Sequence, residues 1–153
     1  MAARLEIGQA FWFGLMWGLR ERGGGCRESG AFLLGPPNGA RVTESAYYDD
    51  LDPDALNAGH IQLGGRAYVP LSDICKQRRL AVKADIHTHP GAWTGQSPSD
   101  QKHPMMPCPG HIALIVPNFA KGNRFILGGV GAYLYHGEGR WSDCRSDLRL
   151  RLW

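Results

Sequence analysis

Two histidines separated by one residue, His87 and His89, have the type and spacing needed to bind a metal ion. They close a segment typical of a strand, and side chains two positions apart lie on the same face of a strand. Pro90 follows directly, so we expect both imidazoles at the carboxyl end of that strand, where α/β domains usually hold ligands. For this pair alone, histidines satisfied by ordinary hydrogen bonds remain an equally good interpretation.

A Ser-Pro-Ser-Asp motif at positions 97–100 follows. As local structure it predicts a helix start, with Ser97 as N-cap, proline at the first helical position and Asp100 completing a capping box. The same position lets Asp100 act as a third ligand beside His87 and His89. Each motif alone is ambiguous, but together they predict a catalytic zinc site with an open fourth position.

Glu28 is the candidate general base. A zinc hydrolase needs a carboxylate outside the ligand set to take a proton from the metal-activated water. Glu28 stands at the mouth of an expected strand over 28–34, where a single glutamate is also typical of a solvated edge charge. From this residue alone, the solvated charge is the preferred interpretation.

Taken together, these elements resemble the signature of the JAMM (JAB/MPN-type) metalloproteases, which is a distant Glu, then His-Ser/Thr-His-Pro, then Ser-x-x-Asp. Here they are Glu28, 87–90 and 97–100, with the spacing of the family. The segment 28–35 (ESGAFLLG) is also similar to the family strand that carries the base. The resemblance extends over most of the chain.

The resemblance implies one α/β domain over residues 1–153, with a central mixed, curved sheet flanked by helices, of the JAB/MPN, cytidine-deaminase-like type. It implies one Zn²⁺ per chain, held by His87, His89 and Asp100 with a bound water. Glu28 would be the general base and later the proton donor to the leaving amine. Ser97 would hydrogen-bond the oxyanion of the tetrahedral intermediate.

The peptidases of this family mostly cut isopeptide bonds after the C-terminal Gly-Gly of ubiquitin or its relatives. The resemblance therefore implies a ubiquitin-like protein or its conjugate as substrate. The compact chain looks most like bacterial stand-alone JAB proteins, which often occur beside ubiquitin-activating-like and ubiquitin-conjugating-like partners. Two alternatives stay open: a JAB peptidase that trims a sulfur-carrier protein or short peptide, and a non-catalytic MPN-type scaffold. Scaffold members lack at least one motif residue, whereas all are present here.

Composition argues against several other functions. The net charge is only +3 without a Lys/Arg stripe, so no nucleic-acid partner is expected. The apolar run at 10–19 is shorter than the roughly 20 residues of a membrane span. We interpret that run as a buried or interface-forming helix, and expect no membrane association.

Four cysteines are spread along the chain without a C-x-x-C pairing. No secretory signal is recognised, so free thiols and a cytoplasmic location are expected. A supplementary metal site of Cys108 with His103 or His111 is conceivable, but packing or surface roles are preferred. The segment 101–110 matches no functional element.

Turn residues and periodicity divide the chain into mixed helices and strands, which predicts an α/β domain on one central sheet. Helices are expected over 8–22 and 70–79, from Ser97, and as one turn within 49–65. Gly14 and Gly18 in the first helix are candidates for close packing. Strands are expected over 28–34, 40–48, 61–63, 80–87, 111–116, 124–127, 132–136 and, as a half-buried edge strand with a cationic outer face, 148–152.

Overall fold

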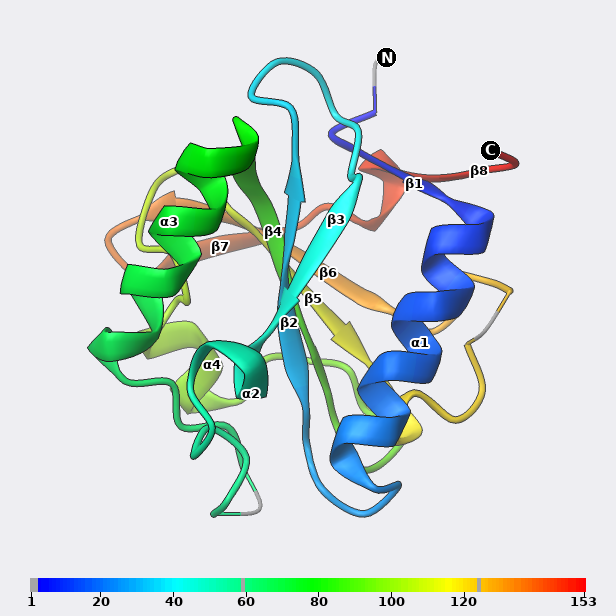
Figure 1. Cartoon of the computed structure of the whole chain (residues 1–153). Helices are drawn as coiled ribbons and strands as arrows, with labels where there is room; N and C mark the ends of the chain where they lie inside the picture. Colours follow the sequence, from blue (N-terminus) through cyan, green and yellow to red (C-terminus); the bar gives the residue numbers. More distant parts are fainter. Residues whose placement is uncertain (1–2, 59, 124) are drawn as a thin grey trace.

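The molecule is built on a central six-stranded mixed sheet (Figure 1). The structure is a computed structural model that describes residues 3–58, 60–123 and 125–153. The strand order is β3-β2-β4-β5-β6-β7. Only β4 and β5 pair in parallel within this sheet; its other neighbouring strands are antiparallel. The strands are β2 (Gly30–Gly35), β3 (Glu44–Tyr47), β4 (Ala81–Thr88), β5 (Ile112–Val116), β6 (Gly131–Gly137) and β7 (Arg140–Asp143).

Helices cover both faces of this sheet, which confirms the expected fold class. Helix α1 (Gln9–Gly23) lies on one side, while α2 (Tyr48–Leu51), α3 (Tyr68–Arg78) and α4 (Pro98–Lys102) lie on the other (Figure 1). Short 3₁₀ turns occupy Gly65–Ala67 and Arg145–Asp147, and Asn118–Ala120 forms a left-handed turn.

Alternation along β2 divides the buried side chains between two cores. Leu33 belongs to the core beneath α1, which includes Trp12, and Phe32 belongs to the core beneath α3, which includes Leu71. Strands β2 and β3, which lie on either side of the segment 36–38, form an antiparallel pair. The central strand β4 thus lies between two apolar layers, and its end is the position at which chemistry is expected.

The first helix ends as its sequence predicts. Gly24 adopts φ 60°, and the N–H groups of Gly24 and Gly25 donate to the carbonyls of Glu21 and Arg20. Glycine takes this left-handed conformation without steric cost, which explains why the helix stops in the triple-glycine segment. Trp12 in this helix is fully buried, in agreement with a buried helix. No helix in the described part of the chain is long and apolar enough to cross a membrane.

A second, two-stranded sheet joins the chain ends. Strand β1 (Leu5–Gly8) pairs in parallel with β8 (Leu148–Arg151), and Arg151 contacts Glu6 at 2.8 Å. The cationic edge strand is therefore confirmed, with Arg149 and Arg151 exposed. Strand β1 was not predicted, because four residues are too few to show a period and Gly8 was assigned to the helix.

Two expected strands are wrong. Residues 61–63 and 125–127 have irregular backbone, while Arg124 lies outside the described residues. Gln62 makes a single backbone hydrogen bond, to Ala55, so no strand ladder forms there. Phe125 instead packs its ring against Phe13 of α1, with centroids 5.3 Å apart. Apolar side chains alone do not make a strand when no partner strand lies alongside.

The two glycines of α1 give a matched stability prediction. A β-carbon at Gly18 would overlap the Tyr47 hydroxyl, whereas one at Gly14 would meet nothing within 4 Å. We expect Gly14→Ala to raise the free energy of unfolding by up to about 1 kcal/mol, because alanine favours helix over glycine. Gly18→Ala should be less stable than Gly14→Ala by about 1 kcal/mol or more. Urea unfolding of both variants measures this difference, and equal stabilities would contradict the packing.

Candidate metal centre

The two histidines converge at the end of β4, as the spacing predicts. His87 lies within the strand, between Gly30 of β2 and Ile115 of β5, and His89 follows the strand directly. Both side chains are buried, and their Nε2 atoms are 3.2 Å apart. Burial and mutual proximity are unfavourable for two ring nitrogens unless a proton or a cation lies between them.

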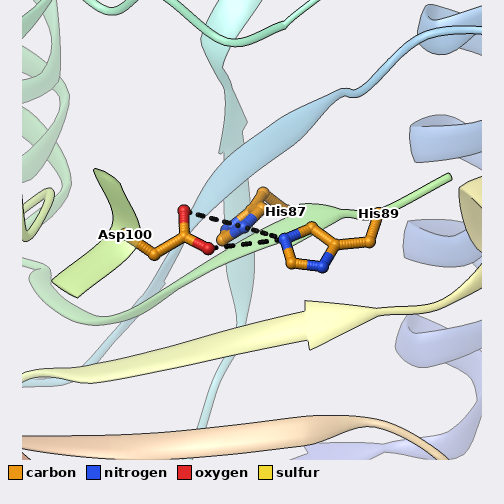
Figure 2. A group of neighbouring side chains, drawn as sticks. All are labelled: His87, His89 and Asp100. Carbon is orange, nitrogen blue, oxygen red and sulfur yellow. Dashed lines mark hydrogen bonds and ion pairs between the residues drawn. The ribbon is translucent and has the colours of Figure 1, made fainter. Parts of the chain in front are cut away.

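The helix start brings the third residue. Asp100 N–H donates to Ser97 Oγ at 3.1 Å, and Ser97 N–H donates to Asp100 Oδ2 at 2.9 Å, so the predicted capping box is confirmed. The same carboxylate faces the imidazoles, with Oδ1 3.5 Å from His87 Nε2 and Oδ2 3.4 Å from His89 Nε2 (Figure 2). Asp100 is therefore both part of the helix capping box and placed as a third ligand beside the two histidines.

These separations fit a divalent ion. Two ligands at the usual Zn–N distance from a tetrahedral centre are about 3.3 Å apart. One ligand atom from each of His87, His89 and Asp100 lies within 4.8 Å of the others. Among the described residues, this is the one such group of three or more His, Cys, Asp or Glu side chains. Two imidazoles and a carboxylate are a donor set typical of catalytic zinc.

His89 has a defined tautomer. Its Nδ1 lies 3.1 Å from the carbonyl oxygen of Trp93, which can only accept, so Nδ1 carries a proton and Nε2 is the nitrogen placed to bind a metal ion. The Trp93 ring also stacks on the imidazole, with centroids 5.6 Å apart. Thr94 holds this loop, because its hydroxyl donates to the Gly129 carbonyl and its carbonyl accepts from the Tyr133 hydroxyl.

A left-handed turn after β5 fixes the backbone of His89. Three consecutive non-glycine residues, Asn118–Ala120, have positive φ values of 55°, 52° and 63°. The N–H groups of Asn118 and Phe119 donate to the carbonyls of Gly91 and His89. Such conformations cost roughly 1–3 kcal/mol each and tend to occur at functional sites. Here the strained turn holds the loop that follows the metal-facing histidines.

The electrostatics of the three residues are mutually supportive. Burial alone lowers the pKa of His87, but the negative charges of the nearby Asp100 and Asp85 carboxylates outweigh it and raise the pKa to about 9. Burial raises the pKa of Asp100, yet the two imidazoles hold it well below its ordinary value. In the absence of a cation, a proton on His87 therefore supplies the positive charge that Asp100 faces.

Glu28 and Ser97 line the same cleft as His87 and Asp100, and the cleft has a volume of about 470 Å³. The backbone beside Glu28 is tied to the motif: Thr88 N–H donates to the Ser29 carbonyl, and Ser29 N–H donates to the Thr88 hydroxyl. The structure thus places the distant glutamate in the same cleft as His87. The sequence analysis did not predict that Thr88 ties the segment of Glu28 to the histidine motif.

The supplementary metal site considered from the sequence is not formed among the described residues. His111 is buried against Asp85, while Cys108 and His103 are exposed, and in the described parts of the chain the three form no metal group. All four cysteines are free, as expected. Sequence reasoning also missed Asp85, although its position two residues before His87 on the same face of β4 was a usable signal.

Comparison with known proteins supports the resemblance. No family model matches the chain. The chain is 32% identical over 76 residues to the probable metalloprotease y4jG of Sinorhizobium fredii, a match that covers 50% of this chain and 46% of the relative. The match thus spans about half the length of that relative. Its name agrees with the similarity to the JAMM metalloproteases.

Solved structures share the fold. A protein from Desulfitobacterium hafniense has a TM-score of 0.65 at 14% identity, with 96% of this chain and 93% of the other covered. A protein from Salinibacter ruber has a TM-score of 0.53 at 16% identity, with 90% and 88% covered. A JAB1/MPN domain protein from Archaeoglobus fulgidus has a TM-score of 0.49 at 15% identity, with 95% and 96% covered. The first two show a shared fold over nearly the whole chain.

The raised pKa of His87 predicts a pH dependence. Without metal, its proton stabilises the fold below the unfolded pKa of about 6.5, and this contribution is lost as pH rises through about 9. Zinc needs the unprotonated nitrogen, so stabilisation by metal should grow over the same range. We expect the rise in Tm on adding one equivalent of Zn²⁺ to be larger at pH 8.5 than at pH 6.

Thermal unfolding with zinc or with a chelator measures this effect. His87→Ala is the control, because the variant should lose the corresponding part of the pH dependence in the metal-free protein. A zinc-induced rise in Tm that is equal at pH 6 and pH 8.5 would contradict the assignment.

Proposed function

We propose that this chain is a zinc-dependent peptidase or isopeptidase of the JAMM type, acting after the C-terminal tail of a ubiquitin or ubiquitin-like protein. The proposal covers both deconjugation and precursor processing. It rests on one observation: His87, Asp100, Glu28 and Ser97 line one cleft, and His89 faces the same carboxylate. The similarity to a probable metalloprotease points to the same chemistry.

The ligand residues and the base have separate roles. A zinc ion held by His87, His89 and Asp100 would supply Lewis acidity and lower the pKa of a bound water to about 7. Glu28 lies in the cleft, outside that ligand group, and its side chain is only partly buried. A carboxylate there can accept a proton from the attacking water and return it to the leaving amine.

Ser97 is suited to stabilise the oxyanion. Its oxygen accepts a hydrogen bond from Asp100 N–H, so its own hydroxyl hydrogen is available to donate. A donor of this kind typically contributes about 3 kcal/mol of transition-state stabilisation. The capping box therefore places both a ligand and an oxyanion donor at one helix start.

Apolar side chains line the cleft beside the metal-facing residues. Ile61 and Leu63 line it from one segment and Met105 from another. Tyr68 of α3 also lines it, and its hydroxyl donates to the Met105 carbonyl at 2.6 Å. Residues without side chains allow a backbone to approach a crowded metal closely, which favours a Gly-Gly tail as substrate. Ubiquitin-activating-like and ubiquitin-conjugating-like proteins are the proposed pathway partners, in the cytoplasm.

The decisive experiment is incubation with a ubiquitin-like protein that carries a C-terminal extension, with and without a chelator. Mass spectrometry should show cleavage directly after the Gly-Gly tail, and the chelator should abolish it. Cleavage of short peptides or a sulfur-carrier precursor alone would favour the trimming alternative. A folded chain that binds no zinc would favour the non-catalytic scaffold.

Removing the base should separate chemistry from metal binding. We expect Glu28→Gln to keep its zinc and its fold but to lose at least 100-fold in kcat, because general base catalysis typically contributes roughly 10²–10⁴-fold. Glu21→Gln, on the exposed surface of α1, is the matched control and should retain activity. Zinc content by atomic absorption and single-turnover kinetics measure the two effects. Turnover of Glu28→Gln at the wild-type rate would remove Glu28 from the mechanism.

Two serines of the same motif test the oxyanion role. We expect Ser97→Ala to lower kcat about 100-fold while the zinc content stays near one per chain. The lost N-cap should also cost about 1 kcal/mol of stability. Ser99→Ala, an exposed position lining the same cleft, should leave kcat unchanged. Equal kcat values for the two variants would exclude oxyanion stabilisation by Ser97.

A further inference from the structure

We infer that Asp85 is a positioning residue of the metal centre, whose carboxylate receives the Nδ1–H of His87 when Nε2 of His87 binds the ion. The inference rests on the proposed metal-dependent function. It concerns a residue outside the ligand set, the base and the oxyanion donor. In this arrangement the buried Asp85 carboxylate orients the His87 ring through Nδ1, on the side opposite the metal ion.

Asp85 lies in the middle of the sheet. It is two residues before His87 in β4, on the same face, and is 2% exposed. Its register partners on the neighbouring strands, Phe32 and Ala113, are also buried. A carboxylate in such a place is costly unless its oxygens are hydrogen-bonded or paired with charge, so the partners of Asp85 indicate its purpose.

Two of its partners are engaged. Oδ1 lies 2.6 Å from His111 Nε2, and Oδ2 accepts from the Tyr48 hydroxyl at 3.4 Å. The third partner is not yet bonded: Oδ2 lies 3.9 Å from His87 Nδ1, which is too long for a hydrogen bond. Asp85 therefore still has acceptor capacity on the side that faces the metal site.

His87 has a buried nitrogen that still needs a hydrogen-bond partner. Its Nδ1 is buried and has no hydrogen-bond partner among the described residues. A neutral imidazole that gives the Nε2 lone pair to a metal ion must keep its proton on Nδ1, and this buried proton needs an acceptor. A movement of about 1 Å would bring Nδ1 and Asp85 Oδ2 to the length of a charge-assisted hydrogen bond.

His111 holds the carboxylate in place. The His111 N–H donates to the Cys108 carbonyl, and its own carbonyl accepts from the Tyr135 N–H, so the residue is fixed at both ends. Carboxylate partners of this kind fix the tautomer and ring orientation of a histidine ligand and raise its basicity. The two ligands thus differ, because His89 relies on the neutral carbonyl of Trp93 whereas His87 has an ionised group behind it.

The test is the zinc dissociation constant, measured by competition with a chromophoric chelator at fixed pH. We expect Asp85→Asn, which keeps the shape but removes the charge, to bind Zn²⁺ 10–100-fold more weakly. Asp73→Asn is the matched control, because it makes the same chemical change at an exposed position of α3. Its dissociation constant should stay within about threefold of wild type, a change well below the 10–100-fold loss.

A double substitution distinguishes positioning from a general effect on the fold. In a His87→Ala background, Asp85→Asn should cause no further loss of zinc affinity, because the group that Asp85 orients is gone. An equal loss in both backgrounds would assign Asp85 a purely structural role and overturn the inference.

A measurement on the wild-type chain covers the case in which Asp85→Asn does not fold. In the zinc-loaded protein with ¹⁵N-labelled histidine, His87 should show a protonated Nδ1 whose hydrogen exchanges slowly with solvent. A rapidly exchanging or absent Nδ1 proton would overturn the inference.

The outcomes also separate this inference from the proposed function. Unchanged zinc affinity in Asp85→Asn would overturn the role of Asp85 and leave the metal-dependent peptidase intact. A wild-type chain that binds no zinc would overturn both.

Discussion

Two buried imidazoles whose Nε2 atoms lie 3.2 Å apart are the constraint on which the site depends. Both nitrogens are turned toward Asp100, so the arrangement needs a shared positive charge. In the metal-free protein a proton on His87 supplies that charge, and the pKa of His87 is raised to about 9 for this reason. A divalent ion satisfies all three groups at once, which makes metal binding and local stability aspects of one interaction.

The scaffold supports this arrangement mainly through backbone contacts. The left-handed turn at Asn118–Ala120 binds the carbonyls of Gly91 and His89, and the Trp93 carbonyl receives the Nδ1 proton of His89. The capping box fixes Asp100 in the same way. These contacts restrict the site geometry before a metal arrives, which is how a site keeps ligands within the narrow tolerance that catalysis requires.

Much of the fold followed from local pattern, and the failures have physical causes. The boundaries of α1 and β4 and the capping box at Ser97 were predicted to within about two residues, because glycine breakers, apolar runs and cap residues act over short range. Residues 61–63 and 125–127 have strand-like composition, but no neighbouring strand offers them a ladder. Strand β1 was missed because its partner, β8, lies at the other end of the chain.

By itself, the sequence determined the three ligand candidates and the local conformations that present them, since His-x-His on a strand and Ser-x-x-Asp at a helix start are short-range geometry. The role of Glu28 as base was implied only by the family resemblance. Only the tertiary structure decided that Glu28 lines the same cleft as His87, because that depends on antiparallel pairing of β2 with β4 across more than fifty residues. It alone revealed that Asp85, His111 and Tyr48 form a buried network behind His87. The spacing of Asp85 and His87 on one strand was visible in the sequence, but His111 and Tyr48 come from other segments and share no period or spacing with them, so only the folded chain brings them together.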